Sequence, residues 1–179
     1  EKMCSDDYQL IIHTQTNLDN YFPELKPTIS KFLENGKLRI IEKTVSAPGL
    51  YHLGDIYVYP SRLEGIGLTI AEAISSGLGL LVPDCGPMNE FVDESFGKSI
   101  ELEKLFSRYD GYYWPQNEVN IFSLAKAMDD IVIQKNNIAL MKNSARNYAE
   151  SHLNWQINSY DILKIFDEKV PSINNFKQQ

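Results

Sequence analysis

Short apolar runs, each bounded by polar residues, recur along the chain and alternate with stretches of helical periodicity. The runs predict buried strands, at residues 9–13, 37–42, 55–60, 78–82 and 98–101. Apolar residues at helical spacing predict helices, at residues 23–34, 65–76, 120–134, 137–151 and 155–170. Strands that alternate with helices across short loops favour an α/β fold, a Rossmann-like parallel sheet with helices on both faces.

Three segments fall outside this alternation. Residues 46–54 predict a turn or short helix, and a short helix is expected near residues 89–93. The aromatic segment 106–114 has no clear period, so we expect an irregular loop. Four of its side chains are expected to pack that loop onto the core, with stacking on a base or lining an acceptor groove as the alternative: Tyr109, Tyr112, Tyr113 and Trp114. Tyr51 and His52, before the third strand, are expected to have structural roles.

Composition narrows the class of partner. Hydrophobic residues make up 43% and charged residues 23% of the 179 residues, which is typical of one folded globular domain. The formal net charge of −7 argues against a nucleic-acid partner, because binding a phosphate backbone needs a cationic face. Any phosphate must therefore be held locally, by backbone amides or by a few placed cations.

Cysteine and histidine form no recognisable site. Cys4 and Cys85 lie in unrelated settings, and His13, His52 and His152 are dispersed, so we expect no metal and no cofactor. The start of the chain resembles neither a signal nor a transit peptide, and no apolar run reaches the length of a membrane span. We expect a cytoplasmic location, with a peripheral position at the inner face of the membrane as the alternative.

Candidate chemistry concentrates where the strand at 55–60 ends and the helix at 65–76 begins, because ligands bind at the carboxyl ends of parallel strands. Gly65 and Gly67 let the backbone approach a ligand closely. The amides of Gly67, Leu68 and Thr69, together with the helix dipole, predict an anion site. The Thr69 hydroxyl and the Arg62 guanidinium are candidate additional donors. A diphosphate could bind there without a metal.

Two glutamates flank this anion site. Glu64 precedes the helix and Glu72 lies two turns along it, which places their carboxylates about 8–10 Å apart at about 1.5 Å per residue. Carboxylates accept hydrogen bonds from hydroxyl pairs, so the arrangement suits a molecule with a sugar on each side of a diphosphate. The simpler interpretation is a solvated loop acid and an exposed helix residue.

The same segment resembles the retaining GT-B glycosyltransferases of the family 4 type, which carry a Glu-x7-Glu motif. The matching residues are the strand and turn 55–61, Glu64 to Leu68, Glu72-Ala73, Gly77 and the strand 78–82. Weaker likeness continues through Gly86, Glu90-Phe91-Val92 and Leu153-Asn154-Trp155.

The resemblance implies a role for each matching position. Glu64 would be the catalytic-site residue that contacts the donor sugar, and Glu72 would bind the ribose hydroxyls. The backbone of Gly65, Ile66, Gly67 and Leu68 would face the diphosphate and sugar, and Val45 would flank the base. The reaction implied is retaining, metal-independent hexosyl transfer from a nucleotide-sugar, with a UDP-sugar preferred, to a lipid-linked or saccharide acceptor in O-antigen-like surface polysaccharide synthesis.

Residues 1–170 are accordingly expected to form a donor-binding domain that is incomplete at its N-terminus, followed by a polar tail at 171–179. The family's basic pair and its acceptor-binding N-terminal domain are not represented, so binding without transfer is expected of this chain. Two alternatives remain: a non-catalytic nucleotide-sugar-binding or scaffolding subunit, and a GT-B-like nucleotide-sugar epimerase.

Overall fold

The computed structural model describes residues 7–169, apart from the side chains of residues 161, 163 and 167–169. The polar tail expected at 171–179 lies outside these residues. Parallel strands form two groups. One is a pair, β1 (Leu10–Thr14) and β2 (Leu38–Glu42), and the other is a three-stranded sheet in the order β3 (Ile56–Val58), β4 (Gly79–Pro83), β5 (Gly97–Ile100). The α/β fold with parallel strands is therefore confirmed, and all five expected strands are present.

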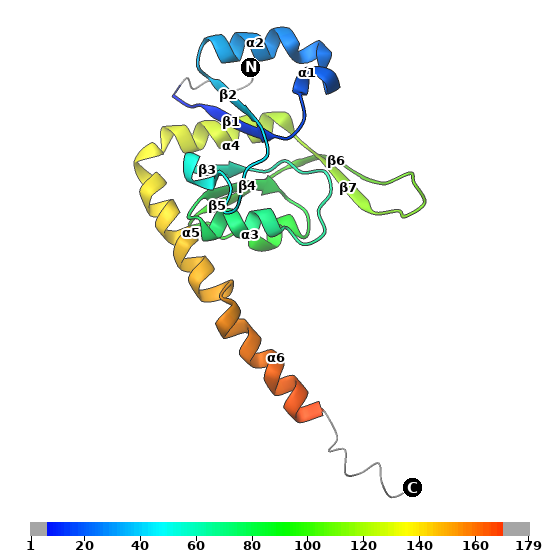
Figure 1. Ribbon diagram of the computed structural model, residues 1–179, viewed down its shortest axis with the longest axis vertical. Coiled ribbons are helices and arrows are strands. Elements are labelled where there is room, and N and C mark those ends of the chain that lie inside the picture. Colours follow the sequence, from blue (N-terminus) through cyan, green and yellow to red (C-terminus); the bar gives the residue numbers. More distant parts are fainter. Residues whose placement is uncertain (1–6, 170–179) are drawn as a thin grey trace, which may run out of the picture.

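Strand β4 is the centre of the core, and every one of its residues is buried. Because side chains alternate between the faces of a strand, Leu80 and Val82 face one side and Leu81 the other. Leu80 and Val82 pack with α3 (Leu68–Ser75) and α5 (Ile138–His152), whereas Leu81 packs with Ile100 and with Ala127 of α4 (Ile121–Ile133). Figure 1 shows α4 on the opposite side of β4 from α3, which confirms helices on both faces.

Helix α3, which follows the third strand, is shorter than expected. It begins at Leu68 because Gly67 has a left-handed φ of +86°, which a helical residue cannot adopt. A Cβ at Gly67 would meet the Phe91 ring at 3.0 Å, so any other residue there would be strained and would force the ring to shift. The expected end is confirmed: Gly77, with a φ of +75°, donates to Ile74 O, and Leu78 N donates to Ala73 O, as in a Schellman cap.

The remaining short elements connect these layers. They are α1 (Leu18–Tyr21), η1 (Pro23–Leu25), α2 (Lys26–Glu34), η2 (Tyr51–Leu53), η3 (Met88–Phe91) and η4 (Lys135–Asn137). The helix expected at 23–34 is thus a 3-10 turn followed by α2, because Pro27 lies in the first turn of α2. Helix α1 was not expected; the Asn17 side chain caps it by accepting a hydrogen bond from Asp19 N.

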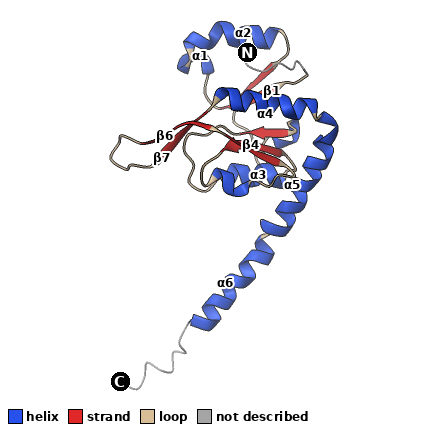
Figure 2. Ribbon diagram, turned by 180° about the vertical axis from the view of Figure 1, so that it is seen from behind, coloured by secondary structure: helices blue, strands red, loops and turns tan. Residues whose placement is uncertain are grey.

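The expectation for the aromatic segment is confirmed for residues 108–114, which form a loop, and is wrong in two other respects. Its first residues belong to β6 (Leu102–Ser107), which pairs antiparallel with β7 (Pro115–Val119), and the hairpin projects from the body of the molecule (Figures 1 and 2). Tyr109 is 92% exposed and Tyr112 and Tyr113 are each 75% exposed, so they do not pack the loop onto the core. Charged residues interrupt β6 and a proline opens β7, which hides both strands from an apolar pattern.

Helix α6 (Trp155–Lys169) follows α5 and extends away from the rest of the protein (Figure 1). The expected apolar stripe includes Trp155, Ile162 and Phe166, all of which are exposed to solvent. Val170, its last expected member, lies outside the described residues. Within residues 7–169, no helix is long and apolar enough to span a bilayer.

Candidate functional site

Glu64 lies in the loop of residues 59–67, here called the motif loop, which connects β3 to α3. Its carboxylate is held at both oxygens: Oε2 accepts a hydrogen bond from the Tyr59 hydroxyl at 2.6 Å, and Oε1 accepts one from Gly65 N at 2.8 Å. The Tyr59 hydrogen bond, followed by the Gly65 amide, holds the pKa of Glu64 below its usual range. Glu64 is therefore an ionised and oriented carboxylate at neutral pH, rather than a freely rotating loop acid.

Glu72 is exposed on α3 and is held in a similar way. Its Oε2 accepts a hydrogen bond from the Tyr51 hydroxyl at 2.7 Å. Burial, and then the hydrogen bond to Glu72, raise the pKa of Tyr51 above its ordinary value, so the phenol stays protonated and remains a donor. A purely structural role was expected for Tyr51, but the structure brings its hydroxyl onto one of the two motif glutamates.

Three tyrosine rings, Tyr51, Tyr57 and Tyr59, here called the aromatic wall, lie between the two glutamates. The ring of Tyr57 stacks on that of Tyr59, with centroids 5.3 Å apart, and meets the Tyr51 ring edge-on at 5.8 Å. Tyr57 and Tyr59 alternate in sequence, so they fall on the same face of the chain as it leaves β3. That spacing is a sequence signal that could have identified these two residues. Tyr51 has no such signal, because its contact with Glu72 spans 21 residues.

The start of α3 differs from an open anion site. The Glu64 carboxylate accepts a hydrogen bond from the Gly65 amide, and the amides of Gly67 and Ile66 also lower its pKa. The amides that were expected to bind an anion therefore interact in part with the protein's own Glu64 carboxylate. The Thr69 hydroxyl oxygen is buried near the hydroxyls of the aromatic wall without reaching hydrogen-bond geometry with any described residue.

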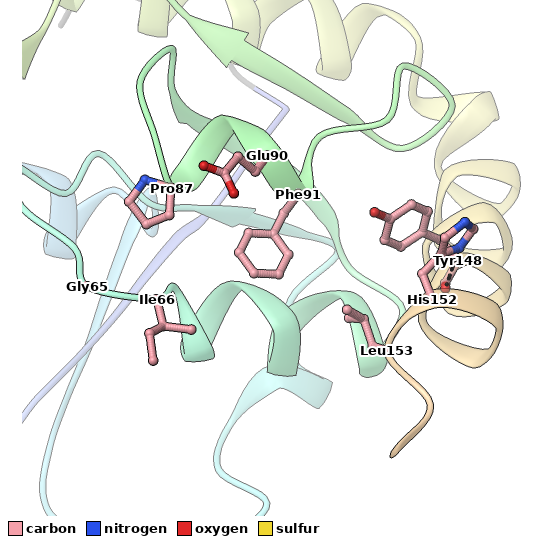
Figure 3. A pocket seen from close by; sticks show the side chains of 8 residues that line it. All are labelled: Gly65, Ile66, Pro87, Glu90, Phe91, Tyr148, His152 and Leu153. Carbon is pink, nitrogen blue, oxygen red and sulfur yellow. Dashed lines mark hydrogen bonds between the residues drawn. The ribbon is translucent and has the colours of Figure 1, made fainter. Parts of the chain in front are cut away.

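Two adjacent hollows open beside the motif loop. The first, of about 390 Å³, is here called the α5 cavity and is lined by Gly65, Ile66, Pro87, Glu90, Phe91, Tyr148, His152 and Leu153. Figure 3 shows Phe91 between Ile66 on the motif-loop side and Tyr148 on α5. The Tyr148 and His152 rings stack with centroids 4.3 Å apart, which gives this cavity an aromatic back wall.

The second hollow, of about 350 Å³, is here called the motif cavity. It is lined by residues 62–65 of the motif loop, residues 85–88 and Glu90, and Leu105 and residues 114–117 of the hairpin. The two cavities share Gly65, Pro87 and Glu90. Within residues 7–169, no three His, Cys, Asp or Glu side chains come close enough together to hold a metal ion.

The expected site residues are only partly brought together. Arg62, Glu64 and Gly65 line the motif cavity, and Ile66 lines the α5 cavity. The guanidinium of Arg62 is exposed and forms an ion pair with Glu118 of β7 at 3.3 Å. It is therefore not a dedicated donor to an anion at the start of α3, the role for which it was a candidate. The other expected residues line neither cavity: Gly67, Leu68, Thr69, Glu72 and Val45. Val45 is half-buried in the segment after β2.

Comparison with known proteins adds a relative and a fold. No family model matches the sequence. Over 90 residues, or 49% of the chain, it is 32% identical to the lipopolysaccharide core biosynthesis mannosyltransferase LpsB of Rhizobium meliloti (strain 1021), of which it covers 26%. The chain thus spans about a quarter of the length of this relative.

Solved structures extend the likeness over most of the chain. A glycosyltransferase from Rickettsia africae ESF-5 superposes with a TM-score of 0.66 over 90% of this chain and 40% of its own, at 17% identity. Anabaena Alr3699/HepE in complex with UDP superposes with a TM-score of 0.67 over 92% of this chain and 42% of its own, at 15% identity. These likenesses show that the chain has the α/β fold found in GT-B glycosyltransferases.

Proposed function

We propose that residues 1–170 are the donor-binding part of a retaining glycosyltransferase of the family 4 type, and that they bind a nucleotide-sugar. The observation that carries the proposal is a pair of oriented glutamates, Glu64 in the loop after β3 and Glu72 on α3, each held by a tyrosine hydroxyl. The partial identity to a lipopolysaccharide mannosyltransferase supports the reaction class. A structural neighbour in complex with UDP supports a UDP-sugar as donor.

In the proposed complex, the ligand extends along the start of α3. The diphosphate lies at the amides of Gly67, Leu68 and Thr69, where the helix dipole favours negative charge. Glu64 accepts hydrogen bonds from donor-sugar hydroxyls, and Glu72 accepts those of the ribose. This assignment places the sugar at the motif cavity and directs the nucleoside toward η2 and the segment that carries Val45.

The proposed mechanism follows from where charge develops. When the bond between the anomeric carbon and the diphosphate breaks, the sugar becomes oxocarbenium-like and the leaving diphosphate gains negative charge. Fixed amides at the start of α3 stabilise the leaving group better than water does, because they need no reorganisation. The ionised Glu64 holds the sugar in a reactive orientation and stabilises its positive charge. We propose that the acceptor is a lipid-linked or free saccharide, contacted by parts of the enzyme outside this sequence.

Calorimetry with UDP, GDP, ADP and their sugars tests the proposal directly on the 179-residue chain. We expect one nucleotide, and UDP in particular, to bind, and its sugar derivative to bind more tightly. Glu72→Ala is expected to weaken binding of the nucleotide itself. Glu64→Ala is expected to reduce only the additional affinity that the sugar provides. Glu34→Ala, at the exposed end of α2, is the matched control.

The result also separates the competing functions. If none of the nucleotides or nucleotide-sugars binds, the donor-binding proposal is wrong. A protein that contains both this chain and an acceptor domain, and that binds the nucleotide-sugar without transferring the sugar, would favour the non-catalytic subunit. In such an enzyme, Glu64→Ala and Glu72→Ala are each expected to lower turnover by about 10²-fold or more, the scale for the loss of one group that stabilises the transition state.

A further inference from the structure

The β6–β7 hairpin is attached to the motif loop at its base. Asn117 of β7 is 2% exposed, and its side-chain amide donates hydrogen bonds to Ser61 O at 3.0 Å and Arg62 O at 3.2 Å. The backbone N–H of Asn117 also donates to Arg62 O at 2.9 Å. These three bonds fix the start of the loop that carries Glu64 against the hairpin, so the two segments behave as one unit around the motif cavity.

The motif cavity has a composition that suits a sugar ring better than a phosphate. Among the described residues that line it, Arg62 is the one cation, and it is already paired with Glu118. The carboxylates of Glu64 and Glu90 contribute negative charge, which opposes an anion. Carboxylate and amide groups are instead suited to hydroxyl groups, which both donate and accept hydrogen bonds.

The hairpin contributes apolar side chains to one side of the motif cavity, here called the hairpin wall. Leu105 and Trp114 line the cavity and are 63% and 52% exposed, and Gln116 lies beside them on β7. A pyranose ring has apolar C–H faces and a polar rim of hydroxyls, and a wall that combines an indole, an aliphatic side chain and an amide matches both.

A buried oxygen at the base of the hairpin has no hydrogen-bond partner among the described residues. Both hydrogen bonds of the Asn117 side chain use its NH₂ group, and its Oδ1 accepts none among the described residues. An unsatisfied buried acceptor of this kind has a free-energy cost unless a water molecule or ligand hydroxyl donates to it. Asn117 lines the motif cavity, but its Oδ1 is itself buried, so a hydroxyl bound there donates to it only if the cavity wall shifts.

We propose that the base of the β6–β7 hairpin is the sugar-recognising wall of the motif cavity, where Trp114 and Gln116 bind a hexopyranose ring opposite Glu64. The inference rests on the proposed function, because it takes the nucleotide to lie on the Glu72 side. The proposed function assigns this ring to the donor sugar, and an acceptor saccharide in the same cavity is the other source, which the experiment distinguishes.

Tryptophan fluorescence makes Trp114 its own probe. The chain contains two tryptophans, so Trp155→Phe leaves Trp114 as the single emitter. Titrations use UDP, UDP-glucose, GDP-mannose and the disaccharides maltose and mannobiose. A donor-sugar site predicts an emission change with a sugar nucleotide but not with UDP. An acceptor site predicts the change with a disaccharide. Equal responses to UDP and to its sugar, or no response to any sugar, would overturn the inference.

Calorimetry on Trp114→Ala and Gln116→Ala separates this inference from the proposed function. Each is expected to weaken binding of the sugar-bearing ligand about three- to tenfold and to leave UDP affinity unchanged. Trp155→Ala, at an exposed position on α6, is the matched control. If UDP binds and neither hairpin variant changes sugar binding, the hairpin wall is wrong and the proposed function stands. If disaccharides bind through Trp114 and no nucleotide binds, the hairpin wall stands and the proposed function is wrong. A wild-type chain that binds none of these ligands refutes both.

Discussion

The hydrogen bond from Tyr59 to Glu64 supports a prediction that needs no ligand. Tyr59→Phe removes the donor to the carboxylate at 2.6 Å and keeps the ring that stacks on Tyr57. A hydrogen bond to a charged group contributes about 1.5–3 kcal/mol to stability, and partial exposure of Glu64 reduces this. The Gly65 amide continues to serve the other oxygen. We therefore expect the variant to lose about 1 kcal/mol of unfolding free energy at pH 7.

A double-mutant cycle in urea measures this interaction. The cycle combines Tyr59→Phe with Glu64→Ala, which removes the acceptor, and compares free energies of unfolding, with Tyr109→Phe at a 92% exposed position as the control for loss of a tyrosine hydroxyl. A coupling energy near 1 kcal/mol is expected between the two substitutions. A coupling indistinguishable from zero would show that the hydroxyl does not act on the carboxylate, and the account of an oriented Glu64 would fail.

The pH dependence of the same bond has a defined sign. The pKa of Glu64 lies below its usual range in the folded protein, with Tyr59 as the largest cause. Its stabilising contribution is therefore complete above the unfolded-state pKa of about 4.3 and is lost as the pH falls through the folded-state pKa. Burial, followed by the bond to Glu64, raises the pKa of Tyr59, so the phenol does not titrate in this range. The stability difference between wild type and Tyr59→Phe should shrink in acid, and a constant difference from pH 7 to pH 3 would refute this cause.

Three further substitutions test the packing around the site by thermal or urea unfolding. Gly67→Ala should destabilise by about 1–3 kcal/mol, because its φ is +86° and its Cβ would lie 3.0 Å from the Phe91 ring, whereas Gly65→Ala, with open space at its Cβ, should have a much smaller effect. Asn117→Ala should cost about 1–3 kcal/mol, because it leaves two carbonyls of the motif loop without their side-chain donors. Phe96→Ala should cost about 3–5 kcal/mol, because this ring is fully buried against the α3 side of the sheet. Unchanged stability in any of these variants would contradict the contact on which it rests.

Local patterns predicted the elements that bury apolar residues at regular spacing. The five parallel strands and the three long C-terminal helices lie within about two residues of the expected ends, because burial in this fold imposes period 2 or 3.6 on the sequence. The start of α3 was missed by three residues. Composition alone does not show that Gly67 takes a left-handed conformation, or that the Phe91 ring, distant in sequence, packs where its Cβ would be.

The hairpin and the tyrosine contacts depend on residues that are distant in sequence. Strand β7 has the sequence PQNEV, and its buried Asn117 is specified by carbonyls of the motif loop some 55 residues earlier. No local pattern predicts a strand from such a contact. Similarly, the Glu-x7-Glu spacing identifies Glu64 and Glu72 as candidates, but only the fold shows which hydroxyls hold them.

The shared amides at the start of α3 lead to a final prediction about proton uptake. The proposed diphosphate would bring negative charge beside Glu64, whose carboxylate already accepts a hydrogen bond from the Gly65 amide. A nearby like charge disfavours the ionised form, so the pKa of Glu64 should rise when the ligand binds. Binding of UDP-glucose, whose diphosphate does not titrate in this range, should therefore take up a proton increasingly as the pH is lowered toward the usual glutamate pKa of about 4.3.

Calorimetry in buffers of different ionisation enthalpy measures this uptake. In Glu64→Gln the uptake should disappear while the nucleotide still binds, because the neutral amide cannot titrate. Uptake that persists in Glu64→Gln would assign the proton to another group and would place the diphosphate away from this carboxylate. Loss of the uptake in this variant would show that Glu64 is the group that titrates and that the diphosphate lies close to its carboxylate. The diphosphate would then compete with Glu64 for the amides at the start of α3, and the Tyr59 hydroxyl would be the donor that holds the carboxylate in place.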